Sequence, residues 1–236
     1  MNERSRLARA AKRHLDGLKV WSLTDLPHAR ESERGETPRK PGGSPGQLST
    51  KETLLADLAS RAAACTRCPL HRTRTKLVMS DGTPHARLMF VGEAPGRDED
   101  LQGVPFVGAA GQLLTKMILA MGLKREEVYI CNVLKDRPPG NRTPLPEEMA
   151  ACLPFLEEQV RIVQPSVICV LGAVAARALV GPDISISRIR GQVLSYQGIP
   201  LVPTFHPAYL LRNPTAKKDV WEDLKRVKRL LETERT

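Results

Sequence analysis

RLMFVGEAPG, at residues 87–96, is the stretch that decides the fold. Its apolar centre, LMFV, runs directly into a loop that contains glycine and proline. A short apolar run bounded in this way predicts a buried strand that ends in a tight turn. Similar apolar runs at residues 128–133 and 167–171 predict two further strands.

Helical spacing of apolar residues separates these strands and continues beyond them. Segments with this spacing lie at residues 51–64, 111–121, 146–163, 173–179 and 217–231. Pro154 is expected to kink or divide the third of these helices. Residues 192–196 and 200–204 indicate a hairpin-like pair of strands. The alternation predicts an α/β fold with three layers, α/β/α, around a short, mainly parallel central sheet of about four strands.

The first fifty residues differ in composition from the rest. Residues 6–21 have the spacing of a basic amphipathic helix, and residues 27–50 are rich in proline, glycine, serine and charged residues. Residues 27–50 have too few apolar side chains to form a buried core, so they are predicted to be a disordered linker. We therefore expect a basic N-terminal extension at 1–50, either inert or a loose DNA tether, and a folded domain at 51–236.

Charge and hydropathy restrict the class of protein. The chain has 236 residues, with 36 Lys and Arg against 26 Asp and Glu, which gives a net charge of +10. A basic balance of this size favours nucleic acid as the partner. The sequence has no apolar run of about 18 residues, so it predicts no membrane span. The charged N-terminus lacks the apolar core of a signal peptide. We expect a cytoplasmic protein without a membrane partner, and a monomer because no interface pattern is evident.

Four unusual segments follow the predicted strands. They lie at residues 92–96, 132–139, 172–174 and 206–212. In open α/β sheets, ligands bind beside the carboxyl ends of the strands, so these segments are expected to meet at one cleft.

Each notable side chain in these segments also has an ordinary structural interpretation. Phe106 is either core or a platform on which a planar ring stacks. Asn132 is either a turn residue or an amide that reads a hydrogen-bonding edge. His206 is either structural or a donor to developing negative charge. The segment from Tyr209 to Arg212 is either the start of a helix or a wedge for duplex DNA.

Several motifs in a fixed order indicate a function more specifically than any of these single residues does. These are CTRCPL at 65–70, VGEAPGRDED at 91–100, GVPFVGAAGQLL at 103–114, VYICNV at 128–133, RPPGNR at 137–142, LGAVAA at 171–176, RGQ at 190–192 and FHPAYLLR at 205–212. In this order the chain resembles the family 4 uracil-DNA glycosylases, the iron–sulfur branch of their superfamily, over roughly residues 52–230.

The resemblance implies an enzyme that flips uracil out of DNA and hydrolyses its N-glycosidic bond, which initiates base-excision repair. It implies that Glu93 positions the attacking water and that His206 stabilises the departing uracil anion. Asn132 would read the uracil edge, and Glu99 would crowd the C5 position where thymine carries a methyl group. The implied uracil pocket comprises Gly92, Glu93, Ala94, Glu99, Phe106, Asn132 and His206. The implied DNA-probing loop comprises Leu210, Leu211 and Arg212.

The family also carries a 4Fe–4S cluster held by four cysteines. Cys65 and Cys68 form a C-x-x-C pair, and together with Cys152 they match three of the family's ligand positions. The fourth position holds Asp136, whose carboxylate is a harder ligand than a thiolate. Asp136 is the first candidate for the fourth ligand; Cys131 is the second, and a labile, partial or absent cluster is the third.

Three other functions remain open on the sequence alone. One is a broader glycosylase that also removes hypoxanthine or other deaminated bases. Another is a catalytically weak protein that binds uracil or single-stranded DNA. The third is a zinc module, for which the cysteine spacing is poor. The joint presence of Glu93, Asn132 and His206 favours catalysis, because binding alone does not require all three.

Overall fold

The computed structural model describes residues 50–233 of the chain. The chain divides into two units, Met1–Thr50 and Lys51–Thr236. The helix and linker predicted for the N-terminal extension lie outside the described residues, apart from Thr50. Within residues 50–233, no helix is both long enough and apolar enough to span a membrane.

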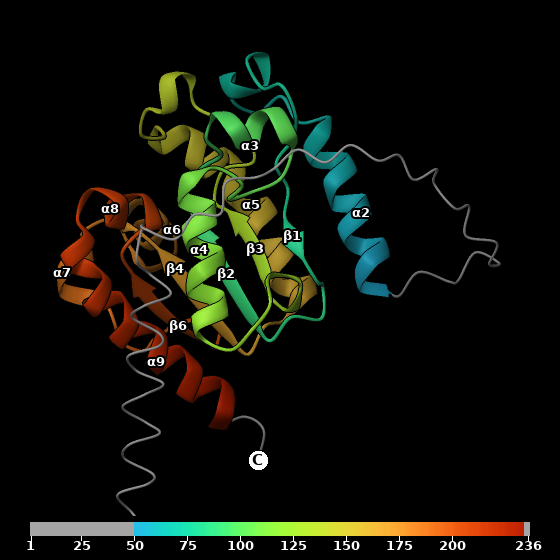
Figure 1. The fold of residues 1–236 in the computed structure, drawn as a ribbon. Helices are drawn as coiled ribbons and strands as arrows, with labels where there is room; N and C mark the ends of the chain where they lie inside the picture. The colour runs from blue at the N-terminus through green and yellow to red at the C-terminus, as the bar shows by residue number, and fades with distance from the viewer. Residues whose placement is uncertain (1–49, 234–236) are drawn as a thin grey trace, which may run out of the picture. The chain divides into compact units, whose positions relative to one another are not determined.

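A six-stranded sheet forms the centre of the second unit, in the order β1-β3-β2-β4-β6-β5 (Figure 1). Its strands are β1 (Asp81–Gly82), β2 (Leu88–Gly92), β3 (Tyr129–Asn132), β4 (Val167–Leu171), β5 (Leu194–Tyr196) and β6 (Ile199–Thr204). The four central strands are parallel, and the two edge strands pair antiparallel to their neighbours. The parallel centre has the expected four strands, and the predicted hairpin corresponds to β5 and β6. The other edge strand, β1, was not predicted.

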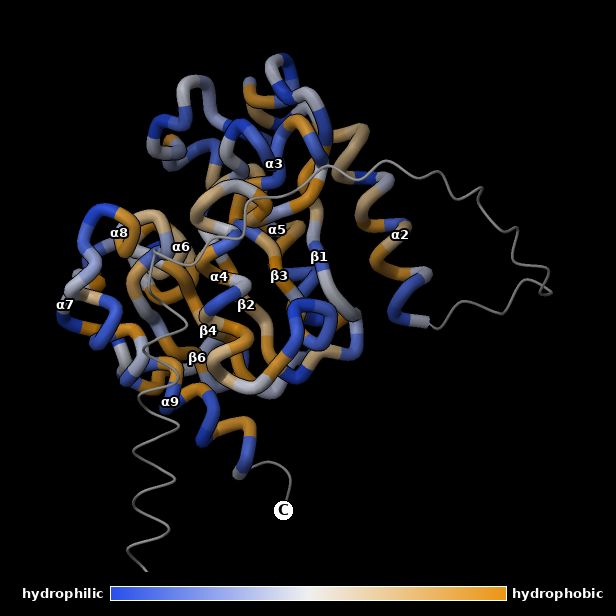
Figure 2. Tube along the Cα trace, viewed as in Figure 1, coloured by the Kyte–Doolittle hydropathy of each residue, from blue (hydrophilic) through white to orange (hydrophobic). Residues whose placement is uncertain are grey.

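Apolar residues fill both faces of the central strands. Every residue of β2 and of β4 is buried, as is typical of parallel strands with helices on each side. Met89 and Val91 belong to a core cluster that includes Leu156 and Val160 of helix α5. Side chains alternate along a strand, so Phe90 points to the opposite face. Figure 2 shows these apolar residues gathered along the strands.

Helices surround this sheet. Their bounds are α2 (Thr50–Ala63), α3 (Arg97–Gln102), α4 (Ala109–Ala120), α5 (Pro146–Val163), α6 (Ala173–Val180), α7 (Ile186–Ile189), α8 (Pro207–Arg212) and α9 (Lys217–Thr233). Short 3₁₀ turns lie at Pro69–Arg72, Arg125–Glu127, Pro139–Asn141 and Pro214–Ala216. The α/β class and the helical layers are as predicted.

Pro154 lies inside α5 without dividing it. A proline removes one backbone donor from a helix and crowds the preceding turn. Buried apolar residues flank this point, among them Phe155, Leu156 and Val160. Their packing stabilises the helix across the missing bond, so the expected division does not occur.

The parallel strands end at one edge of the sheet. The register pairs Gly92 of β2 with Asn132 of β3, and Leu171 of β4 with Thr204 of β6. The loops that follow these residues therefore start side by side, as predicted for the cleft.

Candidate functional site

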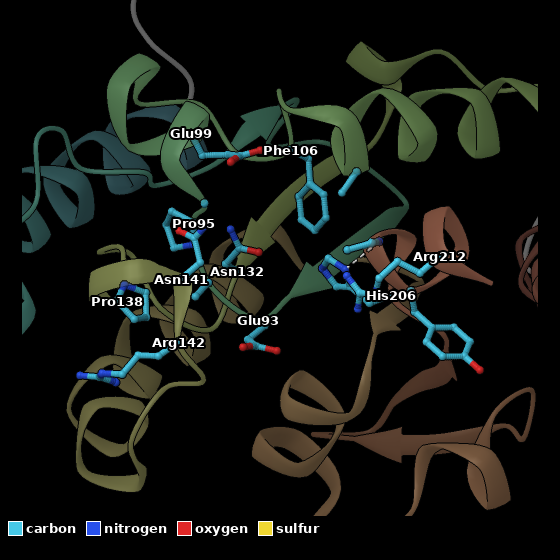
Figure 3. A pocket seen from close by; sticks show the side chains of 15 residues that line it. Glu93, Pro95, Glu99, Phe106, Asn132, Pro138, Asn141, Arg142, His206 and Arg212 are labelled. Carbon is cyan, nitrogen blue, oxygen red and sulfur yellow. Dashed lines mark hydrogen bonds between the residues drawn. The ribbon is translucent and has the colours of Figure 1, made fainter. Parts of the chain in front are cut away.

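A cavity of about 490 Å³ opens at this edge of the sheet. Its size lies within the range of small-molecule sites. Most of the predicted site residues line it: Glu93, Ala94, Glu99, Phe106, Asn132, His206 and Arg212. Figure 3 shows Glu93, Asn132, Phe106 and His206 around one common space. Three of the four strand-end segments, at residues 92–96, 132–139 and 206–212, contribute to the cavity wall.

Asn132 presents an unused hydrogen-bond acceptor to this cavity. The residue is 2% exposed, and its Oδ1 atom is buried without a hydrogen-bond partner within the described residues. Buried polar atoms are nearly always paired, so an orphaned acceptor in a cavity wall points to a ligand that donates to it. A Cβ atom on Gly92 would lie 2.3 Å from this Oδ1 and 2.5 Å from Cζ of Phe106. Only glycine leaves room for both side chains.

Phe106 is held in place by its backbone surroundings. It is 5% exposed and has a φ of 55°, a conformation that bulky residues rarely adopt. Oε1 of Glu99 accepts hydrogen bonds from the backbone N–H groups of Val107 and Gly108, each at 3.0 Å. Glu99 thus lines the cavity and also fixes the turn that carries Phe106.

The imidazole of His206 has a defined tautomer. Its Nδ1 accepts a hydrogen bond from the backbone N–H of Ala208 at 3.1 Å, so the proton of the neutral ring lies on Nε2. Burial, with a smaller contribution from Arg212, lowers the pKa of His206 to about 4. The ring is therefore neutral near pH 7. It lies 5.6 Å from the ring of Phe106, measured between centroids.

Gly172 makes the position of His206 possible. It has a φ of 92°, and a Cβ atom added to it would lie 2.9 Å from Cβ of His206. The segment predicted at residues 172–174 therefore supports the histidine from behind, although it does not line the cavity itself.

Glu93 follows β2 directly and borders the cavity (Figure 3). Burial raises the pKa of its carboxyl group above the ordinary value of 4.5. The loop that carries it is fixed to β3, because the backbone N–H groups of Val133 and Leu134 donate to the carbonyls of Gly92 and Glu93 at 2.9 and 3.1 Å. A carboxylate is thus held at a defined place in the cavity wall.

Leu210, which the resemblance places in the DNA-probing loop, is 0% exposed, because α8 turns it into the core. Leu211 is half-buried and Arg212 is exposed. Tyr209 belongs to the candidate wedge segment but not to the implied DNA-probing loop; it is 39% exposed and lines the cavity, as does Arg212.

Of the cysteines predicted as ligands, Cys65 and Cys68 follow the end of α2, and Cys152 lies in α5. Cys65 and Cys152 pack against one apolar cluster that contains Leu58 and Phe155. Burial raises the pKa of Cys68 and raises that of Cys152 to about 11. Within residues 50–233, no group of three or more His, Cys, Asp or Glu side chains is arranged around a single metal ion. All three thiols are free of disulfides.

Asp136 faces the same region. Its carboxylate contributes to the raised pKa of both Cys68 and Cys152. Nη1 of Arg74 donates to its two oxygens at 3.2 and 3.3 Å and also to the carbonyl of Ala62. Sequence reasoning did not find Arg74, which joins the end of α2 to Asp136.

The two remaining cysteines are core residues. Cys131 lies in β3 and Cys169 in β4, and both are 0% exposed. Burial raises the pKa of each thiol. Cys169 is buried as predicted.

Comparison with known proteins identifies the family of this chain. Residues 79–225 match the model of the Uracil DNA glycosylase superfamily. The chain is 47% identical to the type-4 uracil-DNA glycosylase of Thermotoga maritima, over 78% of this chain and 98% of that one. It is 42% identical to those of Archaeoglobus fulgidus, over 73% and 91%, and Sulfurisphaera tokodaii, over 75% and 84%. The chain therefore belongs to the uracil-DNA glycosylase superfamily, within its type-4 group.

Proposed function

We propose that this protein excises uracil from DNA and leaves an abasic site, which initiates base-excision repair. The observation that carries the proposal is the orphaned Oδ1 of Asn132 in a cavity bordered by Phe106, Glu93 and His206. Uracil presents an N3–H donor beside an O4 acceptor. Oδ1 and Nδ2 of one planar amide can satisfy both. Cytosine presents the reverse pattern at these positions and is rejected.

The reaction begins with extrusion of the uracil nucleotide, which costs about a few kcal/mol. The flipped ring stacks on Phe106, and Gly92 leaves the room that the side chains of Phe106 and Asn132 require. Glu99 holds the turn of Phe106 by its Oε1 and borders the C5 edge of the base. Thymine is disfavoured there because it carries a methyl group.

Cleavage of the N-glycosidic bond moves an electron pair onto the base. The Nε2–H of neutral His206 donates a hydrogen bond to the uracil anion as it forms. The carboxylate of Glu93 faces the sugar, where it offsets the oxocarbenium charge and positions the attacking water. Water adds its oxygen to the sugar carbon, and its proton leaves to the surroundings.

DNA binding is proposed for the rim of the cavity. Arg212 and Tyr209 border it and are exposed. A net charge of +10 supports attraction to the phosphate backbone. We expect Arg212 to contact phosphate and Tyr209 to contact the opened duplex, with Leu211 beside them.

The type-4 relationship implies a 4Fe–4S cluster, and the donor set fits it in three positions of four. In such a cluster each cysteine binds a different iron, so its ligands stand apart and do not surround one ion. We propose Cys65, Cys68 and Cys152 as ligands and Asp136 as the fourth. The charge of the Asp136 carboxylate contributes to the raised pKa of Cys68 and Cys152, which supports its place beside these thiols. Cys131 is disfavoured because it is buried in β3. When bound, the cluster supplies a structural link between α2 and α5.

We further propose that the folded unit at residues 51–236 acts as a monomer in the cytoplasm, with residues 1–50 as an extension. Free cysteines within the described residues are typical of a reducing compartment. Purified protein in a sedimentation experiment is expected to behave as a single chain.

A cleavage assay tests the function. Labelled oligonucleotides with U·G, U·A, T·G or hypoxanthine are incubated with the protein, and alkali then breaks the strand at abasic sites. Breaks at uracil alone support the proposal, and breaks at hypoxanthine as well indicate a broader glycosylase. Binding without breaks indicates a protein that recognises uracil but does not excise it, and this outcome contradicts the proposal.

A further inference from the structure

A fully buried lysine lies directly behind the base-reading amide. Lys135 is 1% exposed, and its Nζ donates hydrogen bonds to the carbonyl oxygen of Asn132 at 2.5 Å and to Oε1 of Gln159 at 2.6 Å. The carbonyl of Asn132 belongs to the residue at which β3 ends. The lysine therefore fixes the backbone from which the amide projects.

The partner of this lysine is itself anchored on two sides. Nε2 of Gln159, a residue of α5, donates to the hydroxyl of Tyr129 at 2.8 Å and to the carbonyl of Met79 at 3.1 Å. Gln159 and Tyr129 are 0% and 2% exposed. The network is closed off from water and joins both ends of β3 to α5.

The backbone of Lys135 reaches the cysteine site. Its N–H donates to Sγ of Cys152 at 3.2 Å. Among residues 50–233 no carboxylate forms an ion pair with its side chain. Burial lowers the pKa of its amino group.

Removal of an amino group from water costs free energy of folding, and an apolar side chain of the same length would fill this position without that cost. The lysine is therefore explained better by what it holds than by packing. One residue touches both a proposed cluster ligand, through its N–H, and the residue that reads uracil, through its side chain.

We propose that Lys135 is a positioning residue that couples the cysteine site to the uracil-reading amide of Asn132. This inference rests on the proposed function. Sγ of Cys152 accepts a hydrogen bond from the N–H of Lys135, and Nζ of Lys135 donates to the carbonyl of Asn132, so the amide is aimed at the base. A cluster bound to Cys152 would fix the first of these contacts. Loss of either bond frees the end of β3 and weakens recognition of uracil, while contacts to the DNA backbone remain.

Lys135→Met tests this coupling because methionine keeps the length of the side chain and removes its hydrogen bonds. The probe is an oligonucleotide with 2′-fluoro-2′-deoxyuridine, in which the fluorine slows cleavage, compared with the same strand carrying deoxycytidine. We expect the ratio of the two affinities to fall about tenfold in the variant. Lys124→Met, a matched change at an exposed lysine, is expected to leave the ratio unchanged.

A second measurement separates positioning from a general loss of structure. Iron removal by a chelator is expected to lower the ratio of affinities for the uridine and cytidine strands in the wild-type protein. It is expected to change this ratio little in Lys135→Met, as coupled sites require. Equal lowering in both proteins overturns the coupling. If Lys135→Met does not fold, Gln159→Met removes one of the two acceptors and is expected to lower the ratio by a smaller factor.

The outcomes distinguish this inference from the proposed function. A wild-type protein with no preference for uracil overturns the proposed function, and the inference with it. A wild-type protein that prefers uracil, alongside a folded, iron-loaded Lys135→Met or Gln159→Met variant with the same ratio, overturns the inference alone.

Discussion

At the scale of single residues, Asn132 determines which base is accepted. Asn132→Asp replaces the amide donor that faces O4 of uracil with an acceptor. We expect the ratio of uracil to cytosine excision to fall about ten- to hundredfold, which corresponds to about 1–3 kcal/mol for an unsatisfied buried group. Initial rates on matched U·G and C·G oligonucleotides measure this ratio.

Asn141→Asp is the matched control, since Asn141 also lines the cavity but its Oδ1 already accepts a hydrogen bond from Arg137 at 2.7 Å. It is expected to leave base selectivity unchanged. Unaltered selectivity in Asn132→Asp would show that another group reads the base.

His206 makes the folded protein sensitive to acid. Its pKa is about 4 in the folded state against an ordinary value of 6.5, so below pH 6.5 the unfolded chain binds a proton that the folded chain does not. Stability is thus fully present above pH 6.5 and is lost as the pH falls towards 4, by about 3 kcal/mol from this group. His206→Gln is expected to lose less stability over that interval. Urea unfolding at pH 7 and pH 4.5 compares the two, and an identical acid loss contradicts the prediction.

Much of the candidate site could be predicted from residue types and their positions after strands. Glu93, Asn132 and His206 follow apolar strands, and parallel strands bring such residues to one edge. The tautomer of His206 and the role of Glu99 in holding the turn of Phe106 depend on contacts between distant segments. Sequence spacing does not encode those contacts.

At the scale of elements, α4 supports the turn that carries Phe106. A Cβ atom on Gly111 would lie 1.8 Å from the carbonyl oxygen of Phe106, a backbone atom that cannot move independently. Gly111→Ala is expected to destabilise the protein by about 1–3 kcal/mol, the range for overpacking, and to lower uracil excision. Thermal unfolding and excision rates measure both effects.

Gly108→Ala is the control for this change, at the N-cap of the same helix. There the nearest atom to an added Cβ is Oδ2 of Asp98 at 3.1 Å, the end of a side chain that can shift. We expect little effect on stability. Equal losses in the two variants would mean that contact with Phe106 is not the cause.

The exposed face of α8 is the expected DNA contact. Arg212→Ala is expected to weaken binding to DNA of any sequence and to reduce the slope of log affinity against log salt by about one, as for one lost phosphate contact. Arg229→Ala, an exposed arginine of α9 that does not line the cavity, is the control. Fluorescence anisotropy at several salt concentrations gives both slopes, and equal slopes in Arg212→Ala and wild type contradict the assignment.

Elements differ in how well their sequences predict them. β2 and β4 are continuous apolar runs, and their positions were predictable to within one residue. β1 has two residues and no pattern that could reveal it. The burial of Leu210 could not be predicted, because a four-residue motif does not indicate which of its side chains an α-helix turns inward.

At the scale of the whole molecule, the proposed cluster would link α2 to α5. Asp136→Ala is expected to lower bound iron by about one quarter, because one iron of four loses its protein ligand. Asp136→Cys is expected to restore it. Cys131→Ala separates the alternatives, because its iron content remains full if Asp136 is the ligand. Iron analysis and visible absorbance after anaerobic purification measure these changes, and a full iron content in Asp136→Ala contradicts the assignment.

The short antiparallel strands at the two sides of the sheet affect how copies of the protein meet. β1 offers two residues and β5 three, which is too little exposed backbone to template the addition of a strand from another molecule. Edge-to-edge pairing between the sheets of two copies is therefore disfavoured at both edges. Short edge strands of this kind therefore disfavour aggregation of the folded protein at high concentration.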